Sequence, residues 1–426
     1  MRRIFVFVGG ASLFAAFPLS AADRDVSAIH SHAIVIDAHA DVPLDLGIGH
    51  HDAAVDSDSQ VDLPKLERGQ VDAVALAVFV NQGARTAEGY AKAREEANVK
   101  LAAIRAIPEK YPDRAVLALS ANDIEAAAIA GKRAIIVGFL NAYSLGKNLD
   151  AIDEFYKAGV RSFGFVHQGN NDYADSSRPI GEPKVEWGGL SPLGKEAVGR
   201  VNRLGMILDI SQLTPAGVMQ TLALTKAPVI ASHSGVKGVV DIMRNLSDGE
   251  LDALKANGGV IQIVAFKPYL MKPVTDLFPR IAATRAKYGL APTFSQTPGV
   301  DDQLTPEQKM DYTYRGSEKL GTQRISYLHE IRDMIPVASV TDLVNSIDYA
   351  VKRIGVDHVG ISSDFNHSGG VVGWNNEGEA QNVTAELVRR GYSDADIDKI
   401  WGGNYLRVFR AVEAVSRSLS ATPAHP

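Results

Sequence analysis

The chain has 426 residues, of which 46% are hydrophobic and 22% are charged, so it can bury a large core as a globular protein. Its formal net charge of -6 excludes a basic surface for nucleic acid or anionic lipid, which leaves a small molecule as the default partner. The absence of cysteine excludes disulfides and thiolate ligands, so any metal ion would be held by histidine and carboxylate side chains.

The first 22 residues have the pattern of an export signal. A positively charged start precedes an apolar run as far as Leu19, and residues 20–22 supply small side chains for signal peptidase. The apolar run is short for a membrane span and is interrupted by glycine and proline. We therefore expect residues 1–22 to be removed and the mature protein to be periplasmic or secreted, without a stable membrane anchor.

Eight short β-type runs follow, with helical patterns between them. Alternating strands and helices predict a parallel sheet, and eight repeats favour closure into a (β/α)8 TIM-type barrel over residues 23–419. A doubly wound open sheet is the alternative. The predicted strands are 33–37, 73–80, 134–139, 162–166, 206–210, 228–231, 260–264 and 358–361. The predicted helices include 86–107, 192–204, 215–224, 247–255 and 340–354, several with start signals.

A polar side chain lies at the end of nearly every predicted strand. This register favours the barrel, because the carboxyl ends of its strands share the single face that carries an active site. Scattered surface residues would not keep this spacing. The residues are His39, Asp41, Asn141, His167, Asn170, Asp209, Gln212, His233 and Asp364.

His39 and Asp41 form a His-x-Asp pair at the end of the first apolar run. Alternation along a strand places residues i and i+2 on one face, so both side chains can reach one site. A neutral imidazole with a carboxylate suits Zn²⁺ or a similar divalent ion. A surface turn is the alternative for an isolated tripeptide of this kind. His233, directly after the sixth run, would face the same mouth as a metal ligand or a substrate contact.

Four further residues are candidates for catalysis and substrate binding. Asp364 could take a proton from metal-bound water and pass it to a leaving amine, or could simply cap a helix. Arg244 could clamp a substrate carboxylate with two hydrogen bonds, or could be a solvated helix residue. His167 could bind a substrate carbonyl or its oxyanion, and Asn170 is expected beside it as a substrate contact.

Residues 268–335 form a long polar insertion before the last predicted strand. We expect it to fold over the barrel mouth as a helical lid. A disordered segment is the alternative. The tail, residues 420–426, is expected to be disordered.

The chain resembles the membrane (renal) dipeptidase family, peptidase family M19 of the amidohydrolase superfamily, over almost the whole mature sequence. The resemblance implies a zinc dipeptidase with two metal ions bridged by a glutamate. It implies that His39 and Asp41 bind the first metal, His233 the second, His167 and Arg244 the substrate, and that Asp364 carries the proton. The matching segments are Ile36–Asp41, Gly188–Gly194, Asn202–Met206, Ser232–Ser234, Arg244–Asn245, His358–Phe365 and Gly402–Val408.

Two positions depart from the metal ligands that the family resemblance implies. Leu140 occupies the position of the family's bridging glutamate and cannot coordinate a metal. Gln212 occupies the position of a histidine that binds the second metal in the family. Asn366 also replaces the usual acidic residue after Asp-Phe. Because a zinc site usually has at least three protein ligands, the sequence does not favour a full two-metal centre.

The sequence thus predicts an exported dipeptidase-like metallohydrolase that cleaves the peptide bond of a small peptide with metal-activated water. A one-metal dipeptidase or amidase is one form of this hypothesis. The alternatives are a barrel with weak or no metal binding that binds or modifies a peptide-like ligand, for example in the maturation of an exported peptide, and a structural or partner-binding descendant. A homodimer is compatible with the sequence.

Overall fold

The computed structural model describes most of the chain. The predicted signal, 1–22, and residues 422–426 of the predicted tail lie outside the described residues, whereas residues 420 and 421 belong to the last helix. The described residues are 24–42, 46, 52–180, 183–272, 274–295, 299–301, 304, 309 and 312–421.

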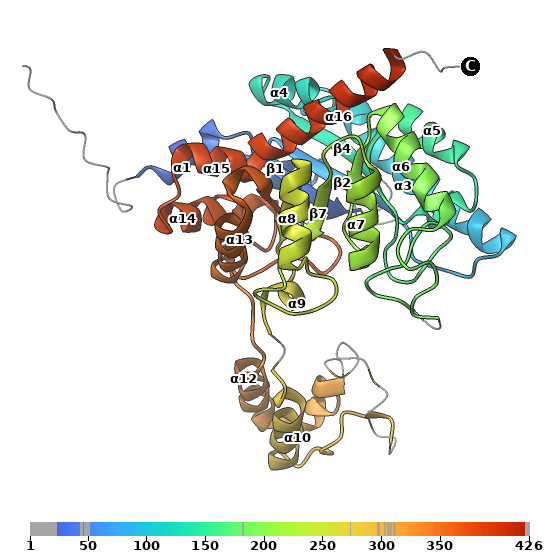
Figure 1. The fold of residues 1–426 in the computed structure, drawn as a ribbon. Helices are drawn as coiled ribbons and strands as arrows, with labels where there is room; N and C mark the ends of the chain where they lie inside the picture. The colour runs from blue at the N-terminus through green and yellow to red at the C-terminus, as the bar shows by residue number, and fades with distance from the viewer. Residues whose placement is uncertain are drawn as a thin grey trace, which may run out of the picture.

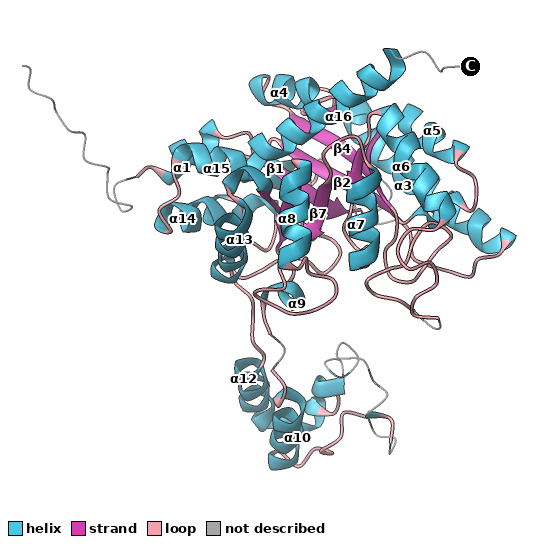
Figure 2. Ribbon diagram, in the orientation of Figure 1, coloured by secondary structure: helices cyan, strands magenta, loops and turns pink. Residues whose placement is uncertain are grey.

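Eight parallel strands form a nearly closed barrel with helices around it (Figures 1 and 2), which confirms the predicted (β/α)8 fold. Closure is made by the chain that follows the last strand. The backbone N–H of Asp41 donates to the carbonyl of Phe365 (2.8 Å), and that of Asp364 donates to the carbonyl of His39 (2.9 Å). The barrel strands, in order, are β1 (Ile36–Asp41), β2 (Ala73–Phe79), β4 (Arg133–Leu140), β5 (Val160–Gly164), β6 (Ile207–Asp209), β7 (Ile230–Ser234), β8 (Val260–Val264) and β9 (Val359–Ser362).

Strands β1 and β7 end well beyond their predicted bounds, whereas β4 and β9 end at Leu140 and Ser362, one residue beyond theirs. β1 continues through His39 and Asp41, and β7 continues through His233, because their backbones still have partners in the ladder after the apolar residues end. A short strand that the sequence pattern does not predict, β3 (Ala115–Leu117), pairs with β4 outside the barrel path. Three residues are too few to give a period-2 pattern.

The helices begin largely where the sequence signals place them. Thr214 accepts a hydrogen bond from the backbone N–H of Gly217, and Ser247 forms a capping box with Glu250. The helices around the barrel are α1 (Val26–His32), α2 (Leu63–Arg68), α3 (Ala87–Lys110), α4 (Ala121–Ile129), α5 (Asp150–Lys157), α6 (Pro192–Leu204), α7 (Pro215–Leu224), α8 (Asp248–Asn257), α9 (Lys267–Leu270), α13 (Val340–Ile354), α14 (Gln381–Arg389), α15 (Asp394–Asp398) and α16 (Asn404–Ala421).

Helix α16 packs on the amino ends of the strands. Its buried Tyr405 and Phe409 belong to one apolar cluster with Ile36 and Ala73, the first residues of β1 and β2. Figure 1 shows this helix running across one end of the barrel. The opposite end, where the strands finish, is therefore the one available for a site.

The insertion is helical but does not cover the barrel mouth. Helices α10 (Leu277–Lys287) and α12 (Arg324–Met334) pack on each other around a small cluster of their own that includes Ile281, Tyr327 and Ile331. In Figure 1 they extend away from the barrel, joined to it by two chain segments. The structure thus differs from the expected lid, because the insertion buries its apolar residues against itself. Among the described residues, no helix has the length and apolar character needed to cross a membrane.

Candidate active site

The carboxyl ends of the strands surround a cavity. Most of its lining residues are ones that the sequence singles out, and Arg178, His367, Phe266 and Tyr269 join them. The lining residues are His39, Asp41, Leu140, His167, Arg178, Gln212, His233, Phe266, Tyr269, Asp364 and His367.

His39, His233 and Asp364 converge in this cavity. One ligand atom from each lies within 4.8 Å of the others, and all three residues are buried. The two imidazole rings stack, with centroids 3.9 Å apart and an interplanar angle of 11°. His39 Nε2 lies 3.7 Å from Asp364 Oδ1. The structure thus brings Asp364, expected as a proton carrier, within reach of a metal that the two histidines would bind.

Burial sets the charge state of these three residues. It lowers the pKa of His39, and with the neighbouring His39 it lowers the pKa of His233 well below its usual value. Stacked neutral rings avoid the repulsion of two cations and keep lone pairs for a metal. Burial, followed by repulsion from Asp41, raises the pKa of Asp364 to about 8. A bound divalent cation would oppose that rise.

Asp41 lies next to His39 but is shared with His367, which the sequence pattern does not single out. Its Oδ1 is 3.9 Å from His39 Nε2, and its Oδ2 is 2.5 Å from Nδ1 of His367. This bond is the main reason that the pKa of His367 is raised. Asp41 Oδ1 is buried without a hydrogen-bond partner among the described residues, so it could add a further metal ligand. The only sequence signal for His367 is its place three residues after Asp364.

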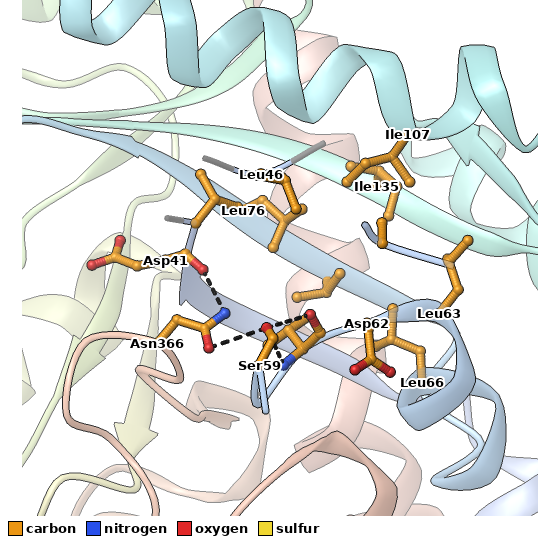
Figure 3. A pocket seen from close by; sticks show the side chains of 14 residues that line it. Asp41, Leu46, Ser59, Asp62, Leu63, Leu66, Leu76, Ile107, Ile135 and Asn366 are labelled. Atoms are coloured by element: carbon orange, nitrogen blue, oxygen red, sulfur yellow. Dashed lines mark hydrogen bonds between the residues drawn. The ribbon is translucent and has the colours of Figure 1, made fainter. Parts of the chain in front are cut away.

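Asn366 holds the main chain of Asp41. Its Nδ2 donates to the carbonyl of Asp41 (3.1 Å), and its Oδ1 accepts from the hydroxyl of Ser59 (3.3 Å) and the backbone N–H of Gln60 (3.0 Å). Figure 3 shows this amide between Asp41 and Ser59, beside an apolar cavity that includes Leu76, with the Asp41 carboxylate directed away from that cavity. Asn366 therefore positions Asp41 and is no ligand itself.

Gln212 is fixed by two arginines. Its Oε1 accepts from Nε of Arg244 and from a terminal nitrogen of Arg178, both at 3.0 Å. These bonds orient the amide, so its Nε2 faces His233 Nε2 at 2.9 Å and donates to it. The other ring nitrogen of His233 lies 2.7 Å from the hydroxyl of Ser232. His233 is thus held in one orientation, and a metal there would have to replace the bond from Gln212.

His167 lines the cavity beside Arg178. A terminal nitrogen of Arg178 lies 3.0 Å from His167 Nε2, and burial followed by this guanidinium lowers the pKa of His167. A neutral ring that accepts at Nε2 carries its proton on Nδ1. That Nδ1 is buried and has no partner among the described residues, which leaves a donor for a substrate oxygen.

Arg244 and Asn170 are not placed as the sequence predicts. Arg244 is 4% exposed and is not among the lining residues, because its nitrogens bond Gln212, the hydroxyl of Ser234 (2.8 Å) and the carbonyl of His233. Asn170 bonds the backbone of its own loop, including the N–H of Ser176 (2.9 Å), and lines a separate cavity. Both side chains hold the loops that shape the site.

The residues present fit one metal ion and do not fit two. Two imidazoles and a carboxylate are a common ligand set of a catalytic zinc, and the unpartnered Asp41 Oδ1 adds to it. Leu140 supplies only an apolar wall beside Ala77 and Phe79.

The backbone is left-handed at two residues of the site, Gln212 (φ 74°) and Asp364 (φ 57°). Such strain in residues other than glycine is concentrated at functional sites.

A parallel barrel that gathers neutral imidazoles and a carboxyl group at the ends of its strands defines the class of metal-dependent (β/α)8 hydrolases. The family described as Membrane dipeptidase (Peptidase family M19) matches residues 23–423, and the chain belongs to this family.

Known relatives agree with this assignment. The probable dipeptidase PvdM from Pseudomonas aeruginosa is 41% identical, with a TM-score of 0.78, over 92% of this chain and 98% of that chain. Dipeptidase tcpJ of Claviceps purpurea is 29% identical over 364 residues, which cover 84% of this chain and 70% of the relative. A metallo peptidase from Rhodobacter sphaeroides, liganded with a phosphinate mimic of the dipeptide L-Ala-D-Ala, shares the fold. Its TM-score is 0.68 at 19% identity, over 89% of this chain and 99% of that chain.

Proposed function

We propose that the protein is an exported dipeptidase-type metallohydrolase that uses a single zinc ion to cleave the peptide bond of a small peptide. The observation that carries this proposal is the convergence of His39, His233 and Asp364 in a chain of the M19 family. A zinc ion held there would activate a water molecule and polarise the scissile carbonyl.

Other side chains would handle the substrate and the proton. The Nδ1–H of His167 can donate to the carbonyl oxygen of the scissile bond, because no protein group among the described residues uses it. His367, oriented by Asp41, can carry a proton to the leaving amine. Phe266 and Tyr269 line the cavity and would supply an aromatic surface for the substrate.

The mature protein, purified without chelator and with zinc supplied, should contain about one zinc ion per chain by elemental analysis, as its three-ligand set implies. It should hydrolyse L-Ala-L-Ala, lose that activity after dialysis against chelator, and regain it with zinc. Two ions per chain would contradict the single-metal proposal, and hydrolysis that survives complete zinc removal would contradict the role of the metal.

The hydrogen bond from Gln212 to His233 favours a second candidate function, in which the barrel binds or modifies a peptide-like ligand without a metal. This bond occupies the lone pair on His233 Nε2 that a metal ion would use. A protein that is purified without metal, and whose melting temperature rises with a small peptide but not with zinc, would select this candidate.

Export is proposed from the pattern of residues 1–22. Expression of the full chain in a Gram-negative host should place the protein in the periplasm, and sequencing of its amino terminus should begin at Asp23. A cytoplasmic protein that retains residues 1–22 would contradict the proposal.

A further inference from the structure

Arg178 is the only arginine or lysine among the described residues that line the candidate active site. It comes from the loop after β5, and its guanidinium reaches both His167 Nε2 and Gln212 Oε1 at 3.0 Å. The sequence pattern does not single it out, because nothing local in the sequence shows that this loop returns to the cavity.

The guanidinium lies where a second metal would have its ligands. Gln212 stands at the position of a histidine that the resemblance assigns to that metal, and Leu140 stands at the position of the bridging glutamate. Arg178 bonds the first of these residues directly. A fixed positive charge there would repel a second cation and attract an anion.

Arg178 also keeps hydrogen-bonding capacity that Arg244 has used. Every guanidinium nitrogen of Arg244 donates within the protein, to Gln212, Ser234 and His233. By contrast, Nε of Arg178 is buried and has no partner among the described residues, and the same holds for Nδ1 of its neighbour His167. The His167 donor is the one assigned above to the scissile carbonyl, so Nε of Arg178 is the buried donor left for a carboxylate oxygen, and a hydrogen bond between two charged groups of this kind is a strong one.

We propose that Arg178 is the residue that binds an anionic group of the substrate, the carboxylate of a peptide-like ligand, in the space that a second metal ion would otherwise occupy. Arg244 then acts as a positioning residue that fixes Gln212. This inference rests on the proposed function for its substrate class, whereas its tests measure binding and metal content without turnover.

The first test is calorimetric titration of the metal-stripped full protein with L-Ala-L-Ala and with its C-terminal amide. We expect L-Ala-L-Ala to bind at least about tenfold more tightly than its amide, because the amide loses a hydrogen bond between two charged groups. Arg178→Met should abolish this preference and Arg178→Lys should keep part of it. No preference in the unmodified protein, or an unchanged preference in Arg178→Met, would overturn the proposal.

The second test restores the missing ligands with Leu140→Glu and Gln212→His together, after circular dichroism has shown that the variant is folded. We expect elemental analysis to find at most one zinc ion per chain while Arg178 is present, and two when Arg178→Met is added. Two ions with Arg178 intact, or one with and without it, would overturn the proposal. Absence of dipeptide hydrolysis would count against the proposed function only.

Discussion

Replacing His39 with alanine is expected to remove the bound metal and to lower dipeptide hydrolysis on the order of 10³-fold or more. His39 is the central member of the candidate ligand set, since it stacks on His233 and lies 3.7 Å from Asp364 and 3.9 Å from Asp41. Without His39 the site keeps a single imidazole, that of His233, which already accepts a hydrogen bond from Gln212, beside the carboxyl groups of Asp364 and Asp41. This set lacks the two imidazoles expected to hold the zinc ion. Zinc content by elemental analysis and the rate with L-Ala-L-Ala measure the two effects.

The matched control is His329→Ala, because His329 is an exposed histidine on α12 in the insertion. It should leave zinc content and hydrolysis unchanged. If His39→Ala retains a full equivalent of zinc, the ligand set inferred from the structure is wrong. If it loses zinc but keeps its rate, the metal is structural.

The barrel is predictable from the sequence because its signals are local. Strands and helices alternate along the chain, and capping residues such as Thr214 and Ser247 mark where helices begin. The same regularity is enough to place His39 and His233 at one end of the barrel. The predicted ends of the two strands that carry these histidines come too early because apolar patterning stops before the backbone ladder does, so both histidines lie within strands.

The arrangement of the site is less predictable, because it depends on how loops return to the cavity. Arg178 and His367 come from loops without regular structure, and no pattern in the sequence says which side chain bonds which. Arg244 is expected from the sequence to clamp a substrate, yet its burial behind Gln212 follows only from the packing of the loops around it. The position of Asp364 beside His39 depends on barrel closure, which is a long-range feature.

The insertion shows the same limit on a larger scale. Its helical character follows from composition, but its placement depends on whether its apolar residues pack against the barrel or against each other. Ile281 and Ile331 are fully buried within the insertion itself. With its own small core, the segment needs no contact with the barrel mouth to hide its apolar surface.

Replacing Trp374 with alanine is expected to lower the free energy of unfolding by roughly 3–5 kcal/mol. Trp374 is 0% exposed and packs edge to face on Phe365, at 5.3 Å, and on Trp401, at 5.9 Å between ring centroids. Phe365 directly follows Asp364, so the cavity left by the substitution would also loosen this third candidate metal ligand. Chemical denaturation followed by circular dichroism measures the stability, and zinc titration should show weaker binding.

Trp374→Phe separates ring packing from hydrogen bonding at this position. The indole N–H of Trp374 is buried without a partner among the described residues, so phenylalanine removes an unsatisfied donor and keeps most of the aromatic contact. We therefore expect Trp374→Phe to cost much less stability than Trp374→Ala and to keep zinc affinity close to that of the unmodified protein. Equal destabilisation by the two variants would contradict this expectation, because it would mean that a phenylalanine ring does not restore the packing that holds the loop carrying Asp364.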